Sequence, residues 1–84
     1  MDYAKTLHDI AVELVHNKDR LEVREMPSLD EDTLTLVVYA DHEDIARLIG
    51  RHGIMANSIR RLMSVPSRMN NKHLDIKFES YGEE

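Results

Sequence analysis

The apolar positions of this 84-residue chain recur with two different periods, which divide it into helices and strands. Spacings of three and four residues, typical of an amphipathic helix, cover residues 2–17, 41–49 and 54–65. Strict alternation, typical of a half-buried strand, covers residues 21–25, 33–39 and 73–79. The predicted order of elements is therefore helix, strand, strand, helix, helix, strand.

Residues that start or stop a helix refine these boundaries. Asp41 is a predicted N-cap of the second helix, and Gly50 ends that helix. The third helix begins at Ile54, and Pro66 is expected to end it at residue 64 or 65. A polar loop then leads to the last strand, and residues 80–84 form a charged tail that we expect to be frayed.

This order constrains the topology of the sheet. The first two strands form a hairpin, so they are antiparallel, whereas a helical crossover makes the second and third strands parallel and right-handed. The prediction is an α+β fold with a three-stranded mixed sheet, whose central strand is residues 33–39, and with helices on one face. At this length, residues 1–84 form a single domain.

Charge is distributed unevenly along the chain. The net charge is −5, yet the segment 45–72 holds six basic residues and no acidic one. Binding of a polyanion responds to the local field more than to the total charge, so this segment is a candidate nucleic-acid surface. With no cysteine, no basic and apolar leader and no long apolar run, we expect a soluble cytoplasmic protein.

A short glycine-flanked turn, Gly50-Arg51-His52-Gly53, lies inside this basic segment and at the head of a predicted helix. Two glycines allow close approach of a sugar–phosphate backbone. The first amides of the helix that begins near Ile54 lack intrahelical acceptors and favour an anion. The turn is therefore a candidate phosphate clamp.

These features together resemble the type II KH domain, of element order αββααβ, and most closely the KhpA group of bacterial single-domain RNA-binding proteins. The residues that carry the resemblance are Leu48, Ile49, Gly50, Arg51, His52, Gly53, Ala56, Ile59, Arg60, Leu62, Ser64, Val65 and Pro66. The chain departs from the family at Ile54, where a basic residue is common, and at His52, where lysine or glutamine is frequent. Both departures lower the positive charge of the clamp.

The resemblance implies binding of single-stranded RNA in a groove between the two helices and the central strand. Its predicted contacts are Ile45, Ile49, Gly50, Arg51, His52, Gly53, Ile54, Asn57, Ser58, Arg61 and Arg68. It also implies a homodimer, or a heterodimer with a larger KH protein of the KhpB type. In that family the complex is regarded as an RNA chaperone linked to cell shape and cell-wall homeostasis.

Other function classes stay open at the level of sequence. Two short helices joined by a turn also describe a helix-turn-helix DNA-binding protein, and a protein-interaction subunit without nucleic-acid contact fits the size. The five histidines show no metal-ligand spacing, and no nucleophile–base arrangement has local support. We therefore predict no metal, no cofactor, no small-molecule substrate and no enzymatic activity.

Overall fold

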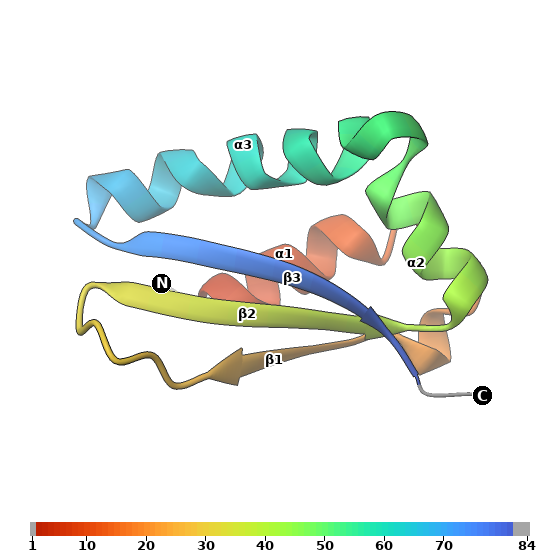
Figure 1. The fold of residues 1–84 in the computed structure, drawn as a ribbon, viewed down its shortest axis with the longest axis horizontal. Helices are drawn as coiled ribbons and strands as arrows, with labels where there is room; N and C mark the ends of the chain where they lie inside the picture. Colours follow the sequence, from red (N-terminus) through yellow and green to blue (C-terminus); the bar gives the residue numbers. More distant parts are fainter. Residues whose placement is uncertain (1, 82–84) are drawn as a thin grey trace.

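The computed structural model describes residues 2–81, which form two layers, a three-stranded sheet and three helices packed on one of its faces (Figure 1). The helices are α1 (Tyr3–Ala11), α2 (His42–Ile49) and α3 (Ile54–Met69), and the strands are β1 (Glu22–Met26), β2 (Thr33–Ala40) and β3 (His73–Ser80). The predicted element order and the α+β class are confirmed. None of the helices within residues 2–81 combines the length and apolar character that a bilayer crossing requires.

The sheet has the predicted topology. β2 lies at its centre, with β1 antiparallel on one side and β3 parallel on the other. Leu36 and Val38, which share one face of β2, are fully buried beneath the helices. The other fully buried large apolar side chains are Leu7 of α1, Leu48 of α2, and Ile59 and Met63 of α3. The core therefore lies between the sheet and all three helices.

The first helix is shorter than predicted. α1 ends at Ala11, and the chain continues through tight turns in which the amide of Leu14 donates to the carbonyl of Ala11 at 2.9 Å. The amides of His16 and Asn17, which would extend the helix, donate instead to a carboxylate on α2. A contact that is distant in sequence thus replaces the last helical turn, which no local pattern reveals.

The third helix is longer than predicted, because Pro66 lies inside α3 and does not end it. Proline inside a helix costs about 3 kcal/mol, but the extra turn buries Ser67 against the core. The helix ends at Met69, and Asn71, just after the C-cap, has a φ of 57°. The amides of Asn71 and Lys72 return to the carbonyls of Arg68 and Ser67 at 3.1 and 2.8 Å, which is a Schellman motif.

The chain after β3 is partly held to the sheet. Tyr81 donates its amide to the carbonyl of Ala40 at 3.2 Å, and its ring stacks on Tyr39 with a centroid distance of 5.9 Å. The guanidinium of Arg20 lies 4.4 Å from the centre of the Tyr81 ring. The frayed tail predicted for residues 80–84 therefore does not include Ser80 or Tyr81, and the remainder lies outside the described residues.

Candidate nucleic-acid interface

The turn between α2 and α3 has a largely left-handed backbone. Gly50, His52 and Gly53 have φ values of 74°, 57° and 76°. Glycine adopts this region freely, and histidine is among the side chains that enter it more often than most. The amide of Gly53 donates to the carbonyl of Gly50 at 3.1 Å and closes the turn. The local sequence therefore suits the backbone that the turn requires.

The two glycines of this turn have different surroundings. A Cβ atom added to Gly50 would lie 2.8 Å from the Cβ of Met55 and 3.0 Å from its backbone nitrogen, so α3 leaves no room for a side chain there. A Cβ atom added to Gly53 would meet nothing within 4 Å. Gly50 thus allows the two helices to pack, whereas Gly53 leaves open space over the start of α3.

Hydrogen-bond donors at the turn are only partly those expected from the sequence. The amide of Ile54 donates to the carbonyl of Arg51, so this helix-tip amide is already used, which corrects the expectation that it is free. The side chains of Arg51 and His52 are both exposed. The polar side chains of the turn therefore lie at the surface, next to the open space at Gly53.

Three of the predicted contact residues surround the turn on exposed positions. Ile54 is 63% exposed, and Ile49 and Asn57 are exposed as well. Ile45 differs, because it is buried within the core cluster and offers little surface to a ligand. The structure thus brings Ile49, Ile54 and Asn57 together beside the two glycines and removes Ile45 from the accessible surface.

The remaining predicted contacts lie further along α3. Ser58, Arg61 and Arg68 are all exposed on the outer side of the helix. At a rise of 1.5 Å per residue, Arg68 is about 22 Å from Gly53 along the helix axis. Arg68 is therefore not part of the immediate surroundings of the turn.

β3 lies beside both helices, and α2 also contacts the central strand β2. α2 and α3 both pack against β3, which lies at the edge of the sheet. Arg60, absent from the predicted contacts, links α3 to this strand. It donates from Nη2 to the carbonyl of Ile76 at 3.0 Å, and its guanidinium lies 5.4 Å from the centre of the Phe78 ring. No spacing in the sequence indicated this contact.

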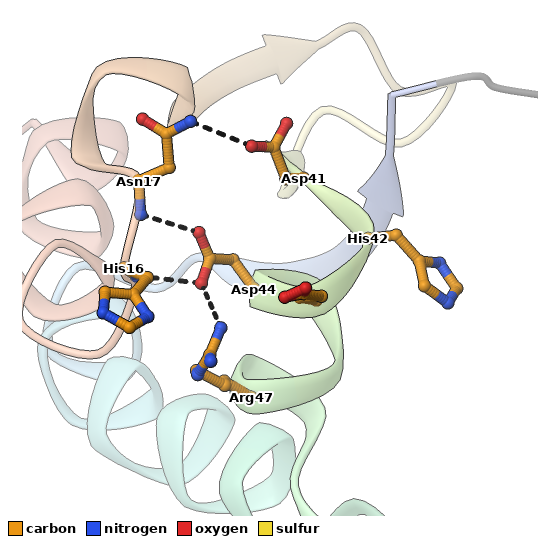
Figure 2. A pocket seen from close by; sticks show the side chains of 7 residues that line it. His16, Asn17, Asp41, His42, Asp44 and Arg47 are labelled. Atoms are coloured by element: carbon orange, nitrogen blue, oxygen red, sulfur yellow. Dashed lines mark hydrogen bonds and ion pairs between the residues drawn. The ribbon is translucent and has the colours of Figure 1, made fainter.

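The opposite end of α2 carries a second polar cluster, which lines a surface cavity of about 510 Å³ (Figure 2). Asp44, only 2% exposed, accepts from the amides of His16 and Asn17 at 2.8 and 2.9 Å and from Nη1 of Arg47 at 2.7 Å. Asp44 lies in the first turn of α2, where an acidic residue also interacts favourably with the helix dipole. Its role is to fasten the segment after α1 to the start of α2.

Asp41, which also lines this cavity, makes hydrogen bonds to the segment that follows α1. Asp41 holds the N-cap position as predicted, but its side chain makes no capping hydrogen bond. It accepts instead from Nδ2 of Asn17 at 3.0 Å and from Nε of Arg20 at 2.9 Å. Figure 2 shows His42 pointing away from these carboxylates. The cluster is a structural junction between α1 and α2.

The pKa of Asp44 reflects this junction. Burial raises the pKa of the carboxyl group, but the two backbone amides and Arg47 stabilise the carboxylate more strongly, so the net pKa lies below its ordinary value of 3.8. Asp44 is therefore ionised at neutral pH, with all of its hydrogen bonds made to the charged form.

Comparison with known families identifies the family of the chain. Residues 4–78 match the family model described as KhpA/KhpB, KH domain. The chain belongs to the KhpA/KhpB family of KH domains. The comparisons with curated proteins and with solved structures give no significant match.

The family assignment confirms the resemblance seen in the sequence, and the element order is that of a type II KH fold. KH domains are RNA-binding modules in which a GXXG loop clamps the nucleotide backbone. In this KhpA/KhpB domain the corresponding loop is the turn at residues 50–53. Within residues 2–81, no group of three or more His, Cys, Asp or Glu side chains is arranged to hold a metal ion.

Proposed function

We propose that this KH domain binds single-stranded RNA by clamping its sugar–phosphate backbone at residues 50–53. The observation that carries the proposal is the combination of the exposed side chains of Arg51 and His52 with open space at Gly53. A phosphate brought into that space can accept from the guanidinium of Arg51 and approach the backbone of the turn closely. The segment 45–72 that contains the turn has six basic residues and no acidic one, which favours a polyanion.

The bases are then placed by the exposed apolar surface next to the turn. Ile49 and Ile54 are exposed on either side of it, and apolar side chains cover base faces without selecting a sequence. Asn57, one turn into α3, supplies an amide that can pair with a base edge. Ser58 and Arg61, four and seven residues after Ile54, lie on the same exposed side of α3 and can extend the contact with RNA, with Arg68 further along the helix.

The proposal extends to the cellular role that the family resemblance implies. A lone clamp with about three phosphate contacts binds weakly, and a second RNA-binding module in the same complex raises the effective affinity. We propose that the chain acts in the cytoplasm as a homodimer or with a KhpB-like KH protein. Its proposed role is that of an RNA chaperone linked to cell shape and cell-wall homeostasis.

The test is the double substitution Arg51→Asp with His52→Asp, measured by fluorescence anisotropy with a single-stranded RNA. Aspartate tolerates the left-handed backbone of position 52, so the fold is retained. We expect affinity to fall by about tenfold or more, since two cationic side chains become anionic beside the phosphates. Undiminished binding of RNA by the folded variant would reject the clamp.

A matched control carries the same change of charge on a distant surface. Lys77→Glu with His73→Glu alters one basic residue and one histidine on β3, where both side chains are exposed. We expect this variant to keep most of the RNA affinity. Competition with duplex DNA tests the alternative of a helix-turn-helix DNA-binding protein. If duplex DNA displaces the labelled RNA more strongly than unlabelled single-stranded RNA does, that alternative is favoured.

A further inference from the structure

The turn at residues 50–53 combines one permanent cation with one titratable side chain. The guanidinium of Arg51 stays protonated throughout the physiological range, whereas histidine changes its charge between about pH 5 and 8. Both side chains are exposed beside the open space at Gly53. The positive charge that the turn offers to a phosphate therefore depends on whether His52 holds a proton.

The start of α3 adds no charge to the turn. Its first six residues are all uncharged: Ile54, Met55, Ala56, Asn57, Ser58 and Ile59. The first basic residue of the helix is Arg60, about 10 Å beyond Gly53 along the helix axis. Its Nη2 donates to the carbonyl of Ile76 at 3.0 Å, which holds the guanidinium at β3. A second positive charge next to Arg51 can therefore come only from His52.

No carboxylate of the neighbouring elements pairs with His52. The turn follows α2 directly and packs against α3. The charged or titratable residues of these helices are His42, Glu43, Asp44 and Arg47 on α2 and Arg60, Arg61 and Arg68 on α3. The two acids lie in the first turn of α2, about 9 Å or more from Gly50 along the axis, and Arg47 is paired with Asp44 at 2.7 Å. None of the ion pairs among residues 2–81 includes His52, so a phosphate has no internal competitor for its protonated ring.

The backbone fixes the point from which the His52 side chain extends. Its φ of 57° and ψ of 22° place it in the left-handed region. The amide of Gly53 closes the turn on the carbonyl of Gly50, and Gly50 is packed against Met55. The imidazole is thus attached to a closed turn, directly beside the space proposed for the phosphate.

We propose that His52 makes RNA binding by this domain pH-dependent, because its protonated ring pairs with a phosphate of the clamped strand. The inference rests on the proposed clamp and adds a regulation of that same site. Binding and protonation are linked, so RNA binds better at low pH and takes up protons as it binds. An exposed ion pair changes an affinity only a few-fold. We therefore expect a graded loss of affinity, about three- to fivefold, as pH rises from 5.5 to 8.

The experiment measures the affinity of the full chain for a single-stranded RNA between pH 5.5 and 8 at constant ionic strength, by fluorescence anisotropy. His52→Asn is neutral and tolerates the left-handed backbone, so it should keep the weaker, high-pH affinity of the wild type throughout. His52→Lys keeps a positive charge over the whole range and should bind at pH 8 nearly as well as at pH 5.5. Circular dichroism at both ends of the range verifies that each variant is folded.

A control is needed because all five histidines titrate in this range. Their protonation makes the net charge of −5 less negative and favours any polyanion. His73→Asn removes an exposed histidine at the start of β3, just after the far end of α3, and should keep the full pH dependence. The carboxylate of Asp44, whose pKa lies below 3.8, stays ionised over the whole range, so its junction is unaffected.

Proton uptake on binding provides the second readout. Calorimetry in two buffers of different ionisation enthalpy should show that the wild type takes up a fraction of a proton near pH 6.5, and that His52→Asn takes up much less. Equal pH dependence and equal proton uptake of the wild type and His52→Asn would overturn the proposal, while loss of RNA binding by Arg51→Asp with His52→Asp would still support the clamp. A wild-type chain that binds RNA at no pH would reject the clamp and this proposal together.

Discussion

The two ends of α2 carry polar groups in opposite surroundings. At its first turn the carboxylate of Asp44 accepts from the amides of His16 and Asn17, which come from a distant part of the chain. Just beyond its last residue, the side chains of Arg51 and His52 are exposed beside the open space at Gly53. One helix thus joins a buried, fully paired polar junction to an exposed, open turn.

This contrast separates the stability of the fold from the proposed binding site. The Asp44 junction fixes the start of α2, and the close packing of Gly50 against Met55 fixes its end relative to α3. The junction therefore contributes mainly to stability, whereas the packing at Gly50 holds the proposed binding turn in place.

The largest effect is expected at the anchored end. Asp44→Asn removes the charge that accepts three hydrogen bonds in a buried site, and we expect a loss of about 2–3 kcal/mol in the free energy of unfolding. Urea denaturation measures this loss. RNA affinity of the folded fraction should change little, because Asp44 does not touch the turn.

Asp41→Asn is the matched control at the same end of the helix. Asp41 also accepts two hydrogen bonds, but it lies nearer to solvent, and its ion pair with Arg20 joins exposed side chains. We expect a loss below about 1 kcal/mol. Equal losses for the two variants would show that burial of Asp44 contributes nothing to the junction.

A smaller effect separates the two glycines of the turn. Both have positive φ, so alanine is strained at either position: by about 1 kcal/mol at Gly53, which is in the left-handed helical region, and by more at Gly50, whose ψ of 173° lies in a region that essentially only glycine adopts. Gly50→Ala also forces a Cβ against Met55, and we expect a total of about 2 kcal/mol or more by urea denaturation. Gly53→Ala should lower the free energy of unfolding only by the backbone strain, because the added Cβ meets no other atom. It should also weaken RNA binding, because the methyl group fills the open space. Equal stability of the two variants would contradict the packing role of Gly50.

The lowered pKa of Asp44 predicts a pH dependence with a definite sign. Because the folded-state pKa lies below the unfolded value, the stabilisation by Asp44 is complete above the ordinary value of 3.8 and is lost as pH falls through the folded pKa. The free energy of unfolding of the wild type should therefore fall more steeply below about pH 4 than that of Asp44→Asn. Parallel curves for the two proteins would show that Asp44 has the same pKa in the folded and unfolded states.

Sequence patterns predicted most of the fold because most of its signals are local. The alternation in β2 and β3 and the helical spacing of α2 are set by neighbours that lie within a few residues, and each element is confirmed. The end of α3 was wrong because Pro66 was given more weight than Asn71, whose left-handed backbone closes the Schellman motif. An asparagine pair before a strand is a helix-end signal that the sequence did contain.

In the candidate site, too, local features could be predicted from the sequence, whereas contacts between distant segments could not. The glycine spacing and the basic segment are contiguous, so the sequence could place the turn between two helices. The bonds of Asp44 cross 27 and 28 residues of chain, and the contact of Arg60 with the Ile76 carbonyl crosses 16, so no period or motif encodes them. These contacts became visible only when the fold brought the segments together.

The smallest predicted effect concerns how many phosphates the turn engages. For single strands each neutralised phosphate contributes about −0.7 to the slope of log affinity against log salt, so three contacts give a slope of about −2. Arg51→Gln removes one cation beside the open space at Gly53 and should make the slope about 0.7 less steep. Lys77→Gln, on the exposed side of β3, should leave it unchanged. If both variants flatten the slope equally, RNA responds to the diffuse charge of the domain, and the turn at the end of α2 does not define its binding site.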